Sequence, residues 1–293
     1  MPSNLLTTDG ADFASSTAGS GTTSYLIPRT LLGEVINAVR KKLLLRGLAA
    51  RVFGPTAIAG RTLVLPLQAE IADATTALPI QQVGEGGEIP LGQSEWTSLT
   101  LTPVKYGARI GVSREMDEDG ILDLLSYHAE LAGYEFADNE ESLIVSQLNT
   151  GASSSSNEVA NSNATLPITD ITRAMQYLEA QNYTPTHMIV GVEVANDLRN
   201  IEEFNTMKDS GSNPKTQRMV GSIFGMNVIV SNNVSSVLAY VIDASHAFVI
   251  AEKRPLTVER YSDFARDTGF VVITQRVSVG VLRAEAIAEI TTT

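Results

Sequence analysis

The chain has 293 residues, enough for one large domain or two smaller ones, and 43% of them are hydrophobic, as in an ordinary globular protein. Its formal net charge of -12 argues against a general nucleic-acid binder, which would normally be basic. There is no cysteine, so disulfides and thiolate metal sites are excluded. No apolar run reaches the roughly 18 residues that a membrane span needs.

The N-terminal segment, residues 2–24, is rich in Ser, Thr, Gly and Ala and lacks the basic start and apolar core of a signal peptide. It predicts an arm that only a partner could hold in place. From Pro28 the spacing of apolar residues predicts a helix that runs to about Val52. Basic residues gather near its end, either as favourable charges at a helix C-terminus or as contacts for an acidic partner such as packaged nucleic acid or a scaffold: Arg40, Lys41, Lys42 and Arg46.

Two predicted strands follow, and a long polar stretch separates them. Residues 60–68 read as an edge strand with Pro66 inside it, and residues 97–113 as its return partner, because apolar and polar residues alternate. The inward set is Leu99, Leu101, Val104, Ala108, Ile110 and Val112.

The stretch between these strands has about 28 residues and no pattern of buried side chains. Unstructured connections longer than roughly 12 to 15 residues are uncommon in compact domains and are usually functional. Run out and back, the loop could reach on the order of 45 Å at about 3.3 Å per residue, whereas the radius of gyration of the whole domain should be about 19 Å. An isolated ribbon is marginally stable, so we expect another subunit to support it.

Residues 117–149 predict a long helix with Asp119 as its N-cap and an apolar stripe through Phe136. Glu141 lies on the predicted solvent face, and the adjacent acids Glu140 and Glu141 are expected to be solvated. Residues 150–164 predict a polar loop.

From Leu166 onward the pattern alternates between helices and strands. Thr169 is a candidate cap for a helix over residues 170–181, and residues 186–191 read as a buried strand. Further elements are predicted as follows: a helix over 193–204, a loop over 207–219, a short strand and turn within 221–234, two strands around a Ser-His turn over 239–261, and closing strands over 269–290.

No catalytic constellation emerges. The glycine-rich Gly19–Ser24 lacks the ending of a phosphate loop, and the acids of Met116–Gly120 lack the spacing of a calcium loop. The three histidines, His128, His187 and His246, have no metal-ligand spacing. Trp96, the only tryptophan, is better explained as a packing anchor at the foot of the loop than as a ligand-stacking residue. We therefore expect neither an enzyme nor a cofactor.

The segment "WTSLTLTPVKYGARIGVSREMDED" resembles tailed-bacteriophage major capsid proteins, in which an aromatic-led strand precedes Pro-x-Lys, a hydrophobic strand and an acidic Ser-Arg-Glu ending. "MIVGVEVANDLRNI" is similar to the strand-then-helix segment of that family, and "MVGSIFGMNVIVSNNV" to its glycine-containing strand. The matching positions are Trp96, Pro103, Lys105, Ser113, Arg114, Glu115, Met116, Gly225, Val228 and Ser231.

The resemblance implies an α+β chain with the Hong Kong 97-type capsid fold. Its expected parts are an N-terminal arm (1–36), an extended β-hairpin loop (54–105), a peripheral domain with a long spine helix (37–53, 106–159 and 254–283) and an axial domain (160–253 and 284–293). No lysine lies between Lys42 and Lys105, so we expect no covalent cross-link through the loop. SDS gels of particles that showed only covalent ladders would refute this.

The implied function is a non-enzymatic head protein that assembles through pentamers and hexamers into an icosahedral shell around viral double-stranded DNA. The implied setting is the virion, after assembly in the host cytoplasm, with a separate scaffolding protein, a portal and room for a decoration protein, and no membrane. An encapsulin-type nanocompartment shares the fold but usually starts with a cargo-binding helix. An enzyme with a loop lid is the third alternative and lacks a catalytic cluster.

Candidate contacts between subunits follow from sign complementarity alone. The acidic loop side contributes Glu85, Glu88, Glu95 and Trp96, and the basic side Arg109, Arg114, Arg254 and Arg260. The resemblance makes the basic cluster of the expected N-terminal helix a candidate for the inner face of the shell: Arg40, Lys41, Lys42 and Arg46.

Overall fold

The computed structural model describes residues 44–68, 82–88, 96–115, 124–161, 165–200 and 221–292. The expected N-terminal arm, the expected helix before Leu44, and the N-cap Asp119 lie outside these ranges. So do the candidates Glu95, Arg40, Lys41 and Lys42, and the polar loop predicted over 207–219. The described elements form three sheets with helices packed on two of them.

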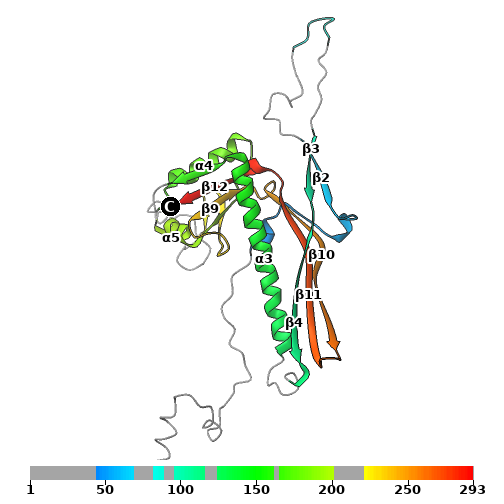
Figure 1. Cartoon of the computed structure of the whole chain (residues 1–293). Helices are drawn as coiled ribbons and strands as arrows, with labels where there is room; N and C mark the ends of the chain where they lie inside the picture. The colour runs from blue at the N-terminus through cyan, green and yellow to red at the C-terminus, as the bar shows by residue number, and fades with distance from the viewer. Residues whose placement is uncertain are drawn as a thin grey trace, which may run out of the picture. The chain divides into compact units, whose positions relative to one another are not determined.

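A four-stranded sheet has the order β1-β10-β11-β4 and consists of β1 (Arg51–Phe53), β10 (Phe248–Asp263), β11 (Thr268–Val281) and β4 (Val104–Ser113). β1 runs parallel to β10, and the other neighbours are antiparallel. The long strands β10, β11 and β4 lie side by side with helix α3 (Leu124–Ser155) along them (Figure 1).

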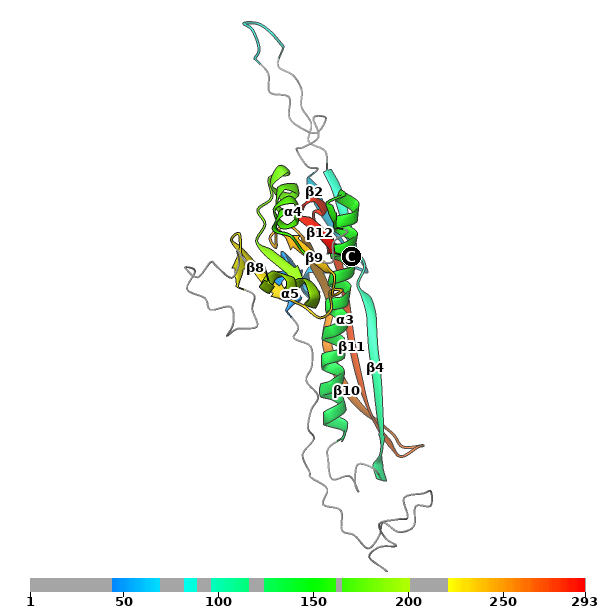
Figure 2. The ribbon, with the colours of Figure 1, turned by 90° about the vertical axis from the view of Figure 1, so that its left-hand side faces the viewer.

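The 32 residues of α3 span about 48 Å at 1.5 Å per residue. Figure 2 shows α3 in front of β11 and beside β4. Ala132 and Phe136 pack against Val271 and Ile273 of β11. The predicted long helix is therefore confirmed, with a different C-terminal end.

The helix continues through residues 150–155, where the sequence predicts a polar loop, so that prediction was wrong. Its serine and threonine hydroxyls donate back to the carbonyl four residues earlier, as Thr150 does to Ser146 at 2.9 Å. Gly151 is packed so closely that an added Cβ would lie 2.6 Å from Ile287, and Ala152 is fully buried. Tertiary packing thus overrides the weak helix propensity of this segment.

The rest of the predicted polar loop also contains a strand, β5 (Glu158–Asn161), which pairs in parallel with β12 (Ile287–Thr292). Together they begin a six-stranded sheet of order β5-β12-β9-β6-β8-β7. The remaining strands are β9 (Leu238–Ile242), β6 (His187–Val190), β8 (Met226–Val230) and β7 (Ser222–Ile223).

One face of this sheet packs against helices α4 (Ile168–Ala180) and α5 (Val192–Asn200) through one apolar cluster. The other face packs against α3, because Ile189 and Tyr240 share a cluster with Ile144 and Leu148. The predicted buried strand and the two helices are confirmed. Thr169 is not the cap of α4, because Pro167 occupies that position and Thr169 lies inside the helix.

The strands on either side of the Ser-His turn are β9 and β10, as predicted, but they belong to different sheets. The chain passes from the six-stranded to the four-stranded sheet over residues 243–247. His246 closes this turn: its Nδ1 lies 2.9 Å from Asp243.

The predicted return strand over residues 97–113 is confirmed only in its first part, because residues 104–113 form β4 and pair with β11 instead. β2 (Leu63–Gln68) pairs antiparallel with β3 (Trp96–Leu101), and Gln68 is the register partner of Trp96. The pair lies against the start of β10 and the end of β11, where an added Cβ on Gly280 would be 2.3 Å from Leu101. The loop of residues 69–95 therefore leaves and returns at one register position.

The helix predicted to run to Val52 is wrong over its described part. Leu45–Leu48 form a short 3-10 helix, η1, and Arg51–Phe53 form β1. This segment is a strand because its backbone pairs with β10: Ala50 N donates to Phe248 O at 2.9 Å, and β1 then pairs in parallel with β10. Val104 was also expected to point inward, but it lies at the end of an edge strand and is 54% exposed.

Candidate assembly interface

The four-stranded sheet has one face under α3 and one open face. Side chains along a strand point to alternate faces. On β4, Tyr106, Ala108 and Ile110 share an apolar cluster with α3, so Lys105 and Arg109 lie on the open face. Both are exposed.

On this open face, Arg109, Tyr261 and Phe270 form a compact group, referred to below as the Arg109 cluster. The Arg109 guanidinium carbon lies 4.7 Å from the centroid of the Phe270 ring. The rings of Phe270 and Tyr261 stack at 5.1 Å with 20° between their planes, and Arg109 Nη1 donates to Tyr261 Oη at 3.3 Å. The glycine at position 111 leaves room for the Phe270 ring, because an added Cβ would lie 2.5 Å from it.

The chemistry of this cluster suits a carboxylate partner. A guanidinium over an aromatic face is attracted to it by about 0.5–1 kcal/mol at exposed sites. The guanidinium has five N–H donors. Among the described residues of the cluster, one of these donors bonds to Tyr261, so others can donate to a carboxylate. Tyrosine and arginine are also enriched among the residues that dominate interface energies. Tyr261 is 44% exposed.

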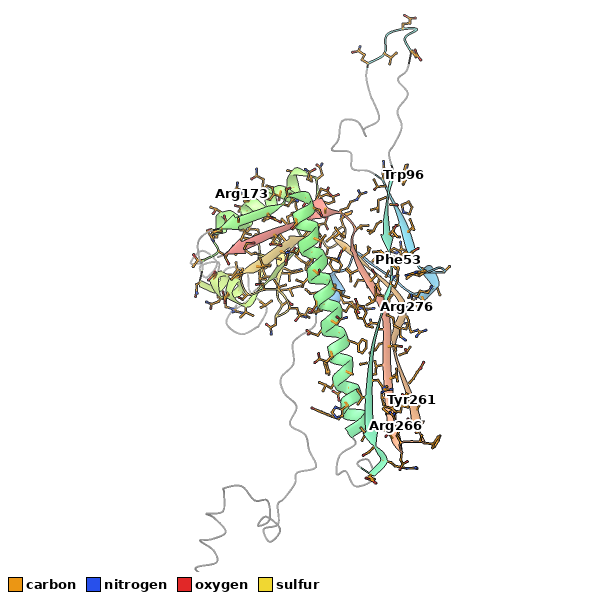
Figure 3. All side chains as sticks on the ribbon, in the orientation of Figure 1. Phe53, Trp96, Arg173, Tyr261, Arg266 and Arg276 are labelled. Atoms are coloured by element: carbon orange, nitrogen blue, oxygen red, sulfur yellow. The ribbon has the colours of Figure 1, made fainter. Side chains whose placement is uncertain are left out.

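The hairpin between β10 and β11 carries the most exposed large apolar side chain among the described residues, Phe264, at 88%. Its turn is well braced, because Asp263 accepts from Ala265 N through its side chain and from Arg266 N through its carbonyl. Figure 3 shows Tyr261 and Arg266 near this end of the strands and Trp96 at the start of β3. A single exposed phenylalanine is ordinary on a protein surface, so this turn does not by itself mark an interface.

The described part of the extended loop, residues 82–88, contains a turn in which Gly87 N donates to Gly84 O at 2.9 Å. Gly86 has a φ of 76°, a backbone conformation that favours glycine. Glu85 and Glu88 are both exposed. Trp96, at the foot of the loop, is 65% exposed.

The structure sorts the predicted basic residues by environment. Arg114 pairs with Asp267 at 3.3 Å on the surface, where both side chains are more than half exposed and such pairs contribute about 0–1 kcal/mol. Arg254 lies at an irregularity of β10, and Arg260 pairs in register with Val271, which places it on the face that carries α3. Within the described ranges, neither Glu85 nor Glu88 pairs with any of these arginines.

Arg46 binds two acids of its own chain. Its Nη1 lies 2.7 Å from Glu140 of α3 and its Nη2 lies 2.6 Å from Glu252 of β10. Glu140 also accepts from Gln275 at 3.0 Å. Arg46, which was a candidate for the inner face of a shell, thus links η1, α3 and β10 of one subunit.

Glu140 and Glu141 were expected to be solvated, and this was wrong: they are 5% and 3% exposed. Glu141 accepts hydrogen bonds from the backbone N–H groups of Leu44 and Leu45, the latter at 2.8 Å, and from Asn233 at 3.3 Å. The helix buries both acids because η1 packs against this face of α3. Periodicity within the helix could not show this, since the η1 residues that bind these acids, Leu45 and Arg46, are 96 and 94 residues away in the chain.

Burial raises the pKa of Glu141, and the two backbone N–H bonds oppose that rise only in part. A carboxyl whose folded pKa exceeds its unfolded pKa holds its proton more tightly in the folded state, so its contribution to stability falls as pH rises from the unfolded pKa through the folded pKa. We expect the urea midpoint of the natural chain, relative to that of Glu141→Gln, to increase when the pH is lowered from about 7 to about 5. A relative midpoint that drops over this range would contradict the assignment.

Within the described ranges, no group of three or more His, Asp or Glu side chains could hold a metal ion. No helix of that part of the chain is long and apolar enough to cross a membrane. Burial lowers the pKa of His187, as expected for a packed histidine.

Sequence reasoning selected Arg109 by its charge but missed Tyr261, Phe270 and Phe264. The three-strand register that brings Tyr261 and Phe270 beside Arg109 is a tertiary property. One signal was available for Phe264: it lies in the short, otherwise mostly charged turn "DFARD", directly after Asp263.

Comparisons with known proteins agree with this architecture. A family model described as phage capsid protein matches residues 96–290. A search of curated proteins finds no match. Three similar solved structures come from phages, and their low identities make them evidence for the fold: Mycobacterium phage Che8 (TM-score 0.73, 15% identity, 91% of this chain and 97% of that chain covered), Microbacterium phage Oxtober96 (0.71, 14%, 92% and 97%) and the capsid of cyanophage P-SCSP1u (0.73, 13%, 94% and 95%).

The match covers well over half of the chain, and the similar structures are matched along nearly their whole length. The α+β architecture is the Hong Kong 97-type fold, and these comparisons favour a phage shell over a nanocompartment. The chain belongs to the phage capsid protein family, as a structural protein of the major capsid type.

Proposed function

We propose that this chain builds the icosahedral head of a tailed phage through pentamers and hexamers and encloses double-stranded DNA. The observation that carries the proposal is the capsid family match over residues 96–290. The role is structural, with no catalytic step. Assembly takes place in the host cytoplasm with a separate scaffolding protein and a portal, and a decoration protein would bind the completed shell.

The described sheets support a division into domains along the expected lines. The peripheral domain corresponds to α3 with the four-stranded sheet, and the axial domain to the six-stranded sheet with α4 and α5. The extended loop corresponds to the segment that starts and ends at the β2–β3 pair. The axial domains would meet at the axes of the pentamers and hexamers.

The loop supplies the contact between subunits in this proposal. Its exposed acids Glu85 and Glu88 would meet the Arg109 cluster of a second copy, whose guanidinium lies on an open sheet face beside two aromatic rings. Arg109 suits this role better than Arg114, which already pairs with Asp267, or Arg260, which lies on the face that carries α3.

Reversing both loop acids, Glu85→Lys with Glu88→Lys, is expected to reduce the yield of closed shells at least about tenfold, because opposite charges at the contact become like charges. Adding Arg109→Glu to the same chain should restore part of the yield, since every copy carries both halves of the contact. The yield is measured by sedimentation and particle counting.

Lys105→Glu is the matched control, because Lys105 is exposed on the same strand and the same face four residues from Arg109. It should not rescue the loop variant. Shell yield unchanged by the double loop variant, or equal rescue by Lys105→Glu, would remove the loop acids from the interface.

A further inference from the structure

The open face of the four-stranded sheet carries a row of three cations, referred to below as the cation row. Arg276 of β11 is the register partner of Lys105 of β4 on one side and of Arg254 of β10 on the other. Residues directly opposite one another on antiparallel strands share a face and have Cβ atoms about 4.5–5.5 Å apart. Figure 3 shows Arg276 partway along the sheet, between Trp96 at the start of β3 and Tyr261 on β10.

The cation row has no acidic partner among the residues that the structure describes, since no acid of that part of the chain lies within ion-pair distance of Lys105, Arg254 or Arg276. The Arg276 guanidinium donates to a backbone carbonyl, that of Pro103, at 3.3 Å. Lys105 and Arg254 are both exposed. Like charges directly opposite each other in a sheet are destabilising, so the row has a cost in the isolated subunit that an anionic partner would remove.

Small side chains lie beside the cation row. The next register positions toward Arg109 that share its face are Gly107, Thr274 and Thr257. Glycine within a strand often marks a place where another backbone approaches closely. Packing within the subunit does not require this glycine, because an added Cβ on Gly107 would lie 3.6 Å from its nearest contact, the Thr274 methyl group, which is an ordinary van der Waals distance. The missing side chain therefore leaves room above the sheet for an incoming backbone next to the cations.

The size and charge of this surface fit a short acidic segment better than nucleic acid. Adjacent strands are about 4.8 Å apart, so the row is about 10 Å long. An extended peptide places alternate side chains on one face about 7 Å apart, so two of its carboxylates can lie along the row. A nucleic-acid binder would normally be basic, whereas this chain has a formal net charge of -12. Two acids, Glu259 and Asp263, also lie on the open face further along β10, where a longer polyanion would meet them.

We propose that the cation row binds a short acidic segment of a second protein, which lies extended across the strands with its backbone over Gly107. The carboxylates of the segment pair with Lys105, Arg254 and Arg276, because arginine donates to a carboxylate through a planar fork and lysine acts as a point charge. Lys105 lies four residues from Arg109 on β4, about 14 Å at 3.4 Å per residue. The site is therefore separate from the Arg109 cluster and does not depend on the proposed loop contact.

The described loop of another copy does not have the form of this segment. Glu85 lies inside a turn, in which Gly87 N donates to Gly84 O at 2.9 Å, and Glu88 follows directly after it. These two acids are therefore not alternate residues of an extended segment. A protein other than this chain is the source of the segment, and self-association of the subunit tests the alternative.

Binding of a fluorescent hexaglutamate peptide to the unassembled full-length subunit, followed by anisotropy at about 0.1 M salt, tests the proposal. Lys105→Gln with Arg254→Gln should weaken binding roughly two- to twenty-fivefold, because each exposed ion pair is worth a factor of roughly 1.4 to 5. Gly107→Val changes no charge and suits a strand, but it fills the space above the sheet, so it should also weaken binding. The matched control is Arg173→Gln with Arg260→Gln, which removes the same charge from α4 and from the face that carries α3. The control should leave the affinity nearly unchanged, because the Debye length is about 10 Å at this salt concentration.

A second measurement separates a binding site from a structural role. Because opposed like charges destabilise the sheet, Lys105→Gln with Arg254→Gln should raise the urea midpoint of the subunit while it weakens peptide binding. A lower midpoint would mean that the cations support the fold of the subunit, and it would overturn the proposal.

Four further outcomes would also overturn the proposal. They are no binding of hexaglutamate by the natural chain, equal weakening by the row variant and its control, tighter binding of a thymidine oligonucleotide of the same charge through the same residues, and self-association of the natural subunit that Lys105→Gln with Arg254→Gln abolishes. The last of these would assign the row to another copy of the chain.

Discussion

Replacing residues 69–95 with the dipeptide Asn-Gly is expected to give a folded subunit that no longer forms closed shells. Gln68 and Trp96 are register partners at the end of the β2–β3 pair, so a two-residue turn can join them without disturbing either strand. The apolar side chains that hold this pair to the body, including Leu65, Leu99 and Leu101, all remain. The thermal midpoint should therefore change little, while the reach toward a neighbour is lost.

Two controls separate the effects of length and sequence. A glycine-serine loop of the natural length should also fail to assemble, because it lacks Glu85 and Glu88. The natural loop grafted back should restore shells. Normal shells from the Asn-Gly variant, seen by electron microscopy of the sedimented fraction, would show that the loop does not support assembly.

Glu141→Ala is expected to cause the largest loss of stability of any single change at the buried acids of α3. The substitution leaves the backbone N–H groups of Leu44 and Leu45 and the side-chain amide of Asn233 without their acceptor. Because Glu141 is only 3% exposed, water has little access to these donors. An unsatisfied buried donor costs about 1–3 kcal/mol, so we expect about 2–4 kcal/mol in total, allowing for water that replaces part of the carboxylate. Urea denaturation followed by circular dichroism measures the change.

Glu135→Ala is the matched control, since Glu135 lies on the same helix and is exposed. It should stay within about 0.5 kcal/mol of the natural chain. Comparable losses in the two variants would mean that the cost arises from helix propensity or surface charge and not from the buried acceptor.

Periodicity recovered the parts of this fold whose partners lie nearby or whose pattern is strong. The alternation around Leu99 and Leu101 predicted the β2–β3 pair, and the buried run at Met188 predicted β6. Periodicity failed where packing against residues far away in the sequence determines the secondary structure. Residues 150–155 are helical because Ala152 is buried in the apolar cluster shared with the six-stranded sheet, and Arg51–Phe53 are a strand because β10 lies beside them.

The candidate interface divides in the same way. Charge alone selected Arg109 as a candidate, and loop length alone predicted that residues 69–95 would reach another subunit; both remain predictions. The two rings beside Arg109 come from strands about 150 residues further along the chain, so only the folded register reveals them. The burial of Glu141 depends on contact with η1, which no local pattern contains.

The central claim is that the support for the extended loop is the next subunit. Electron microscopy of the expressed protein after size-exclusion chromatography tests it most directly. We predict closed shells, or rings of five and six subunits. A monomer at every concentration, with residues 69–95 resistant to protease, would contradict the claim, because the loop would then have its support within its own chain.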